Sequence, residues 1–93
     1  MKRLTDVPPG SQVEITSIEA DLSLCKRLAE LAFLPGEQLF VVANNPNGYV
    51  VVESRRGRFG LPREIAEKII VRELYVQPRY GGRRRRWGWR RNI

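Results

Sequence analysis

The sequence predicts a mainly β fold: a small barrel of five short strands, with one α-helix between the first two strands and a short helical turn before the last. Three observations support this prediction. Five short runs of apolar and β-branched residues are separated by turn residues. Leucines recur at helical spacing in one stretch. A flat five-stranded sheet would leave long apolar edges in a chain of 93 residues, and closure into a barrel removes those edges.

The helix is predicted to end at about Ala32. Three leucines stand at positions i, i+4 and i+7 and therefore share one face that can pack on the sheet: Leu24, Leu28 and Leu31. Asp21 or Ser23 can cap the N-terminus of the helix, because either side chain can accept a hydrogen bond from a backbone amide of the first turn.

The same turn is predicted twice, in the stretches PGSQVEI (residues 9–15) and PGEQLFV (residues 35–41), and each turn leads directly into a strand. Proline followed by glycine is typical of a type II turn, in which the glycine has a positive φ. Val13 and Ile15 alternate with polar residues, so the first strand is expected to have one face in water. The second strand is predicted over residues 39–43.

The rest of the domain is predicted to alternate between turns and short strands: a loop over residues 44–48, a strand over 49–53, a turn over 55–57, a strand over 58–61 and a last strand over 70–74. The pair Asn47-Gly48 is a strong signal for a hairpin turn. Pro62 is expected to occupy the first position of the helical turn, with Ile65 and Ile69 directed inward.

The net charge of +7 lies entirely at the C-terminal end of the chain. Residues 1–78 hold ten Lys and Arg and ten Asp and Glu, whereas residues 79–93 hold seven Arg and no acidic residue. The end of the chain has no periodic apolar face and a high density of like charge, so we expect it to be disordered. We therefore assign residues 1–76 to a folded domain and residues 77–93 to a basic tail.

The tail combines eight residues that can contact an anionic target: Arg83, Arg84, Arg85, Arg86, Trp87, Trp89, Arg90 and Arg91. Arginine and tryptophan can hold single-stranded nucleic acid by neutralising phosphates and stacking on bases. They can also bind an anionic membrane surface, where each basic residue adds about 1 kcal/mol and Trp prefers the interface. A third interpretation is a solubilising tail without a target.

No catalytic constellation, cofactor site or metal site is predicted. The chain has no His and a single Cys, so it lacks the usual ligands of a zinc or soft-metal site. Glu64 and Glu67 share one face of the helical turn and could hold an ion, but simple solvation is the favoured interpretation. No apolar run approaches the roughly 20 residues that span a membrane.

Two stretches are candidates for binding a partner protein. Phe33 and Leu34 lie where the helix turns into the second strand. Phe33 is either an exposed anchor of the kind that dominates interfaces or a cap on the core, and the sequence leaves both interpretations open. The second stretch is a basic turn that either faces a partner or is merely solvated: Arg55, Arg56 and Arg58.

These residues together resemble the FeoA family, ferrous iron transport protein A. The stretch RLAELAFLPG (residues 27–36) is similar to a family pattern of Arg-Leu, Leu-Gly, one or two hydrophobic residues and Pro-Gly. GRFGLPREIAEKIIV (residues 57–71) is similar to the family's closing pattern of Gly, a short strand, a helical turn with Ala, then Ile and Val. Ala32 stands where the family often has Gly, and because Ala is costly in a left-handed conformation, we expect the chain to leave the helix differently.

The resemblance covers about residues 4–73 and implies an SH3-like barrel without enzymatic activity that assists ferrous iron uptake in the cytoplasm. The implied partner is a membrane ferrous iron transporter with a cytosolic GTPase region, and the protein would bind its cytosolic side while binding no iron itself. The tail would then lie at the inner face of the membrane. Two alternatives remain: a nucleic-acid-binding module that uses the tail, and a regulatory domain like those of metal-dependent repressors. The sequence does not indicate an oligomeric state.

Overall fold

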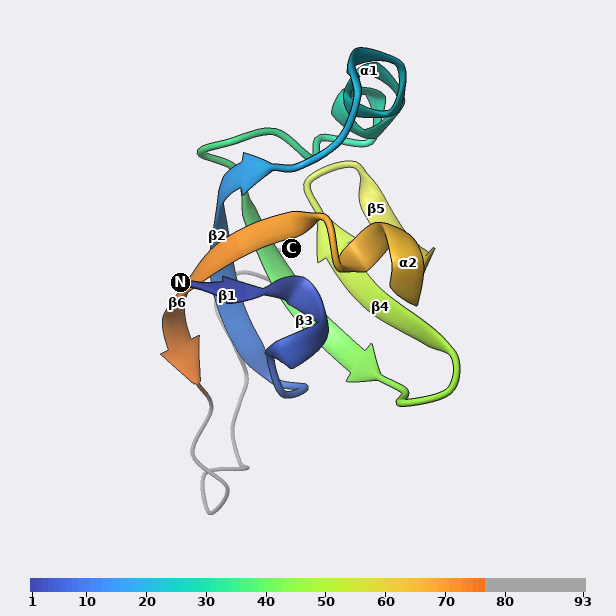
Figure 1. Cartoon of the computed structure of the whole chain (residues 1–93). Helices are drawn as coiled ribbons and strands as arrows, with labels where there is room; N and C mark the ends of the chain where they lie inside the picture. Colours follow the sequence, from blue (N-terminus) through green and yellow to red (C-terminus); the bar gives the residue numbers. More distant parts are fainter. Residues whose placement is uncertain (77–93) are drawn as a thin grey trace.

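The computed structural model describes residues 1–76, which form one antiparallel sheet of six strands with a helix at one end (Figure 1). The elements in chain order are β1 (Lys2–Arg3), the 3-10 helix η1 (Leu4–Asp6), β2 (Ser11–Ile18), α1 (Leu22–Glu30), β3 (Gln38–Asn44), β4 (Tyr49–Ser54), β5 (Gly57–Pro62), α2 (Arg63–Ala66) and β6 (Ile69–Val76). The mainly β class and the positions of both helices confirm the prediction. The predicted basic tail lies outside the described residues.

The sheet has six strands instead of the predicted five, in the order β1-β6-β2-β3-β4-β5. The additional strand is β1, in which Lys2 pairs with Val71 and Arg3 pairs with Ile70. Two exposed basic residues carry no alternating pattern, so this strand was not predicted. The 3-10 helix that follows places Leu4 in the core, where it is fully buried.

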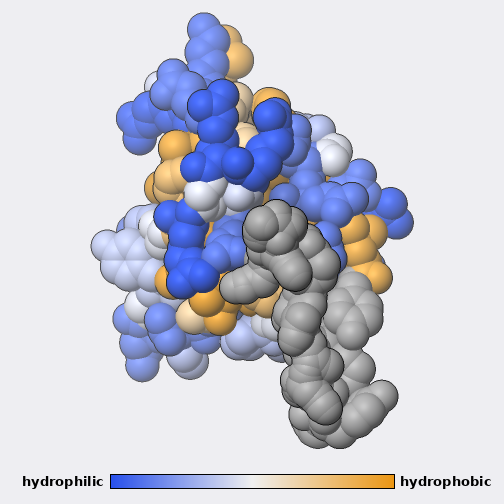
Figure 2. Space-filling view, turned by 180° about the vertical axis from the view of Figure 1, so that it is seen from behind, coloured by the Kyte–Doolittle hydropathy of each residue, from blue (hydrophilic) through white to orange (hydrophobic). Residues whose placement is uncertain are grey.

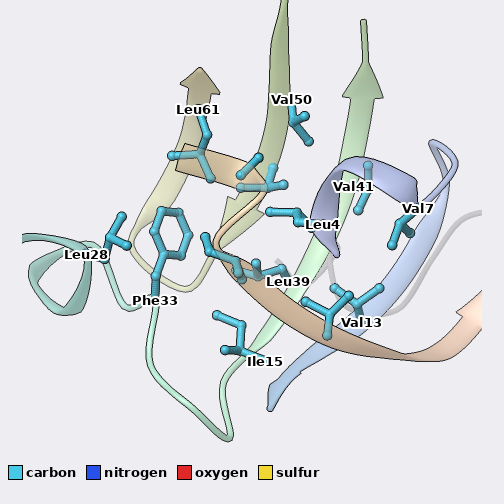
Figure 3. Packing of buried hydrophobic residues seen from close by; sticks show 14 residues of the cluster. Leu4, Val7, Val13, Ile15, Leu28, Phe33, Leu39, Val41, Val50 and Leu61 are labelled. Atoms are coloured by element: carbon cyan, nitrogen blue, oxygen red, sulfur yellow. The ribbon is translucent and has the colours of Figure 1, made fainter. Parts of the chain in front are cut away.

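The inner face of the curled sheet encloses a single core (Figure 3). Each long strand contributes alternate side chains to it, as the period-2 pattern predicted. The largest fully buried apolar side chains are Leu4, Val7, Val13, Ile15, Phe33, Leu39, Val41, Val50, Val52, Ile69 and Val71. The helix α1 joins this core through the predicted leucine face: Leu28 is buried, and Leu24 and Leu31 are partly buried against the core.

The two Pro-Gly turns hold β2 and β3 in a locally symmetric arrangement. Gly10 and Gly36 have φ angles of 90° and 95°, which confirms the predicted need for glycine. The Gly10 amide donates to the Val41 carbonyl at 2.8 Å, and the Gly36 amide donates to the Ile15 carbonyl at 2.7 Å. Each acceptor is the fifth residue after the glycine of the other turn. The similar stretches PGSQVEI and PGEQLFV are therefore related by a local two-fold axis across the strand pair.

The end of α1 contradicts the expectation drawn from Ala32. This residue adopts a left-handed conformation, with a φ of 70°. The Ala32 amide donates to the Ala29 carbonyl at 3.0 Å and the Phe33 amide to the Leu28 carbonyl at 2.9 Å, which is a Schellman motif. A non-glycine residue costs about 1–2 kcal/mol in this conformation. Burial of the Ala32 methyl group and of Phe33 offsets that cost.

Two further boundaries differ from the prediction, and both lie at a proline. The β3–β4 turn closes with a hydrogen bond of 3.1 Å from the Gly48 amide to the Asn45 carbonyl, so Pro46 and Asn47 are its central residues. Proline presets the φ angle of the first central position, which moves the turn one residue ahead of the Asn47-Gly48 pair. Pro62 ends β5 and is the N-cap of α2 rather than its first helical residue.

One arginine ties three segments of the domain together. Arg63 donates from Nη1 to Asn44 Oδ1 at 2.7 Å and to the Asn45 carbonyl at 2.6 Å. Its Nη2 donates to the Thr5 carbonyl at 3.2 Å. The Asn44 amide group in turn donates to the carbonyls of Thr5 and Val7, at 2.9 and 2.8 Å. This network fixes the N-terminal segment against the end of β3 and the start of α2.

Candidate partner-binding site

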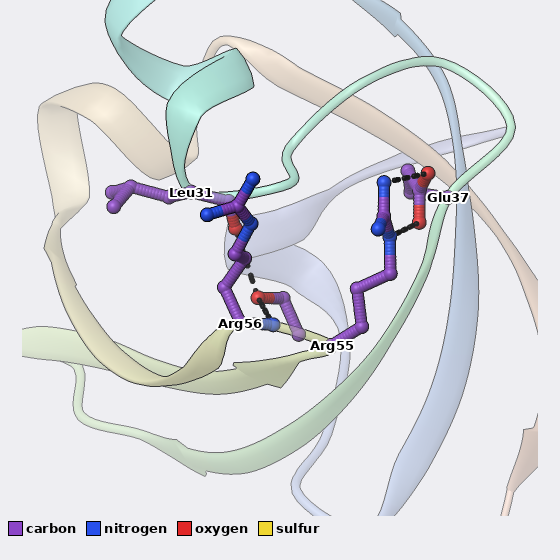
Figure 4. Close-up of polar contacts among 5 residues, drawn as sticks. Leu31, Glu37, Arg55 and Arg56 are labelled. Carbon is purple, nitrogen blue, oxygen red and sulfur yellow. Dashed lines mark hydrogen bonds and ion pairs between the residues drawn. The ribbon is translucent and has the colours of Figure 1, made fainter.

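The end of α1 and the β4–β5 turn form one surface, although they are far apart in the sequence. Ser54 joins them, because its Oγ donates to the Leu31 carbonyl at 2.9 Å and accepts a hydrogen bond of 3.0 Å from the Arg56 amide (Figure 4). We call this the helix–turn surface, and it comprises Leu31, Leu34, Glu37, Arg55 and Arg56. The structure thus brings together the two stretches that the sequence proposed separately.

Sequence reasoning missed Ser54, which holds this surface together. A serine can accept a hydrogen bond from the backbone amide two residues later, and this local signal favours a turn after Ser54. Its second hydrogen bond, to Leu31, depends on tertiary structure and leaves no trace in the sequence.

Arg55 is engaged within the domain. Its Nε and Nη2 donate to the two carboxylate oxygens of Glu37, at 3.0 and 3.2 Å (Figure 4). Hydrogen bonding to Glu37, followed by attraction to its negative charge, raises the pKa of Arg55. Arg58 is engaged in the same way, because it forms an ion pair with Glu53, its cross-strand neighbour on β4.

Phe33 lies in the core, so the interpretation of this residue as an exposed anchor is wrong. Its side chain is fully buried, and its ring meets that of Phe59 edge-on, with centroids 5.8 Å apart and an interplanar angle of 83°. The physical reason is the Schellman motif, in which the second residue after the cap packs back against the last helical turn. The exposed apolar residue of this segment is Leu34, which is 39% exposed.

Arg56 differs from its two neighbours in the basic turn. Its backbone amide bonds to Ser54, but its side chain forms no ion pair or hydrogen bond within residues 1–76. On the part of the molecular face visible in Figure 2, hydrophilic side chains surround small apolar patches. Two residues of the helix–turn surface are therefore best suited to binding another protein: Leu34, which is exposed, and Arg56, whose side chain has no partner among the described residues.

The described residues contain no group of three or more His, Cys, Asp or Glu side chains that could hold a metal ion. Glu64 and Glu67 are both exposed. Cys25 is partly buried, with its Sγ 3.6 Å from the Ala20 carbonyl oxygen. Within residues 1–76, no helix is long and apolar enough to cross a membrane. A polar hollow lies between β1, η1, the end of β2 and the segment before β6, and Arg3 and Glu19, which bond to each other, both line it.

Comparison with known proteins gives one family and several similar structures. The family model of the FeoA domain matches residues 2–73. No curated protein matches the sequence significantly. The crystal structure of an iron uptake regulatory protein (FeoA) is 22% identical, with a TM-score of 0.73 over 77% of this chain and 96% of that chain. FeoA of Stenotrophomonas maltophilia, solved with zinc and described as an SH3 domain protein, is 27% identical, with a TM-score of 0.64 over 74% of this chain and 87% of that one.

A manganese-dependent transcriptional repressor also has a similar structure. It is 21% identical, with a TM-score of 0.72, and the match covers 78% of this chain but only 41% of the repressor. At this level of identity the likeness concerns the fold alone. Together these similarities confirm the predicted SH3-like class.

Proposed function

Because the chain belongs to the FeoA domain family, whose model matches residues 2–73, its role is in ferrous iron transport, and we propose that it is a non-enzymatic accessory protein of ferrous iron uptake. In this proposal the protein acts in the cytoplasm and binds no iron itself. It binds the cytosolic side of a membrane ferrous iron transporter with a GTPase region and modulates it. The family match carries the proposal, and the Stenotrophomonas maltophilia relative, described as a candidate ferrous iron transport activating factor, supports it.

The helix–turn surface is the proposed contact with the transporter. Interfaces combine apolar side chains with arginine at their centre and are surrounded by a polar rim. Leu34 supplies the apolar side chain and Arg56 supplies the arginine. The ion-paired side chains of Arg55 and Arg58 supply the polar rim. Phe33 supports this surface from below instead of contacting the partner.

Removal of this protein is expected to change the uptake of ferrous iron in cells that carry the transporter, because the accessory would no longer modulate it. Uptake of radiolabelled Fe²⁺ is the measurement, and expression of the full chain from a plasmid should restore the original rate. Unchanged uptake in the deletion strain, together with no binding of the purified transporter's cytosolic region, would refute the proposed function.

We also propose that the basic tail binds an anionic membrane surface, on the evidence of its charge. Replacement of Arg83, Arg84, Arg85 and Arg86 by Gln in the full chain is expected to cost about 4 kcal/mol of vesicle binding, at about 1 kcal/mol for each residue. That cost corresponds to roughly a thousandfold weaker affinity. Since the chain has two tryptophans, Trp87 and Trp89, intrinsic fluorescence reports on the tail, and it should shift to the blue on insertion into lipid.

Single-stranded RNA tests the competing interpretation of the tail, because stacking on bases should quench the same fluorescence. Both ligands should be titrated at one near-physiological salt concentration, since binding to either is weakened by screening. RNA binding at least about tenfold tighter than vesicle binding would favour the nucleic-acid-binding module.

A further inference from the structure

The arginines of the described domain fall into two groups. Five of the seven arginines have a partner within the fold: Arg3 with Glu19, Arg55 with Glu37, Arg58 with Glu53, Arg63 with Asn44 and Arg72 with Glu14. The side chains of the other two, Arg27 and Arg56, form no ion pair or hydrogen bond with the described residues. Within the described domain, these two guanidinium groups therefore keep all their donors available for an external ligand.

Arg56 belongs to the helix–turn surface. Arg27 lies in the last turn of α1, four residues before Leu31, the C-cap residue that belongs to this surface. The carbonyl of Leu31 bonds to Ser54, and Ser54 bonds to the amide of Arg56 (Figure 4). Within the helix–turn surface, the carboxylate of Glu37 is occupied by two nitrogens of Arg55. The charge of Arg56 is therefore not neutralised by any other residue of this surface.

The apolar part of the surface is held in a fixed position. Leu34 opens the second Pro-Gly turn, and its carbonyl accepts a hydrogen bond of 3.0 Å from the Glu37 amide. The Gly36 amide anchors the same turn to the Ile15 carbonyl on β2 at 2.7 Å. A side chain on such a preorganised turn loses little conformational entropy when a partner covers it. Leu34 can therefore serve as an apolar contact with a small loss of conformational entropy.

From this arrangement we infer that the partner presents a carboxylate to Arg56 and an apolar side chain that covers Leu34. Arginine suits this role because its planar fork binds a carboxylate through two hydrogen bonds. Arg55 and Arg58 border the same surface but contribute less, because Glu37 and Glu53 already neutralise them. This inference rests on the proposed function and adds to it the chemistry of the partner's contact segment.

The test compares substitutions in the full chain for binding to the purified cytosolic region of the ferrous iron transporter. Arg56→Gln should weaken binding at least tenfold and Leu34→Ala severalfold, while Arg56→Lys should recover only part of the affinity because it lacks the planar fork. Arg72→Gln is the matched control, since it makes the same charge change at an arginine that already pairs with Glu14 on distant strands. It should bind like the wild type. Thermal melts of each variant verify that the domain remains folded.

The outcomes separate this inference from the proposed function. If the wild-type chain does not bind the cytosolic region, the proposed function fails and the inference fails with it. If the wild type binds and Arg56→Gln binds equally well, the inference alone is wrong. Equal weakening by Arg56→Gln and Arg72→Gln would show that only overall charge matters, and would also overturn it. A loss of anionic vesicle binding by Arg56→Gln, without a loss of transporter binding, would assign Arg56 to lipid phosphate instead of a carboxylate.

Discussion

Replacement of Phe33 by Ala is expected to destabilise the protein by about 3–5 kcal/mol, the usual cost of removing a buried aromatic ring. Phe33 is fully buried and packs edge-on against Phe59, so its loss removes a ring pair and leaves a cavity at the junction of helix and sheet (Figure 3). Small domains have total stabilities of about 5–15 kcal/mol, so this single change should bring the domain close to unfolding. Denaturant titration followed by far-ultraviolet circular dichroism measures the effect.

The neighbouring residue provides the control for Phe33. Leu34→Ala should cost less than about 1 kcal/mol, because this side chain is 39% exposed and its truncation opens no cavity. If Phe33→Ala were as mild as Leu34→Ala, Phe33 would not be part of the core. Selective loss of partner binding by Leu34→Ala, with stability preserved, would agree with the role proposed for this exposed side chain.

Leu28→Ala is expected to cost about 2–5 kcal/mol, the range for a buried leucine. Leu28 is 4% exposed and is the one buried residue within α1. Its carbonyl also accepts the Phe33 amide, so Leu28 lies at the point where the helix, the Schellman motif and the core meet. Its truncation should loosen α1 from the sheet, which would appear as increased amide hydrogen exchange in the helix.

The same helix carries two further leucines for comparison. Leu22 is 70% exposed, so Leu22→Ala should change stability by less than about 0.5 kcal/mol. Leu31 is only partly buried, and Leu31→Ala should fall between the two. Equal costs for Leu22→Ala and Leu28→Ala would contradict the packing of this helix, because the residue type and the helix are the same and only burial differs.

The features that were predictable from the sequence are those that depend on near neighbours in the chain. Alternation of apolar residues identified the long strands, and leucine spacing identified the buried face of α1. Proline and glycine marked the two tight turns before β2 and β3, because proline restricts φ and glycine can adopt a positive φ. Asp21 was one of two predicted caps, and it accepts the Leu24 amide at 2.8 Å. β1 was missed because two exposed residues have no pattern to detect.

Which residues of the candidate site point outward depends on contacts between segments that are distant in the sequence. Ala32 adopts a left-handed conformation that its own preference disfavours, because burial of its methyl group and of Phe33 offsets the local cost. That single backbone choice sends Phe33 inward and leaves Leu34 exposed. No local sequence pattern predicts this conformation of Ala32, because the contacts that offset its cost come from residues distant in the sequence.

The pairing of the arginine side chains also depends on the fold and not on the local sequence. The sequence indicates three arginines around one turn. It does not show which of them pair with a carboxylate, because such pairs form only when the chain folds. Arg55 pairs with a glutamate 18 residues away, whereas Arg72 pairs with one 58 residues away. Arg56 forms no such pair within the described domain, whereas the carboxylate of Glu37 pairs with Arg55. Charge content is fixed by the sequence, but the availability of one charge for binding is fixed by the three-dimensional packing of all the others.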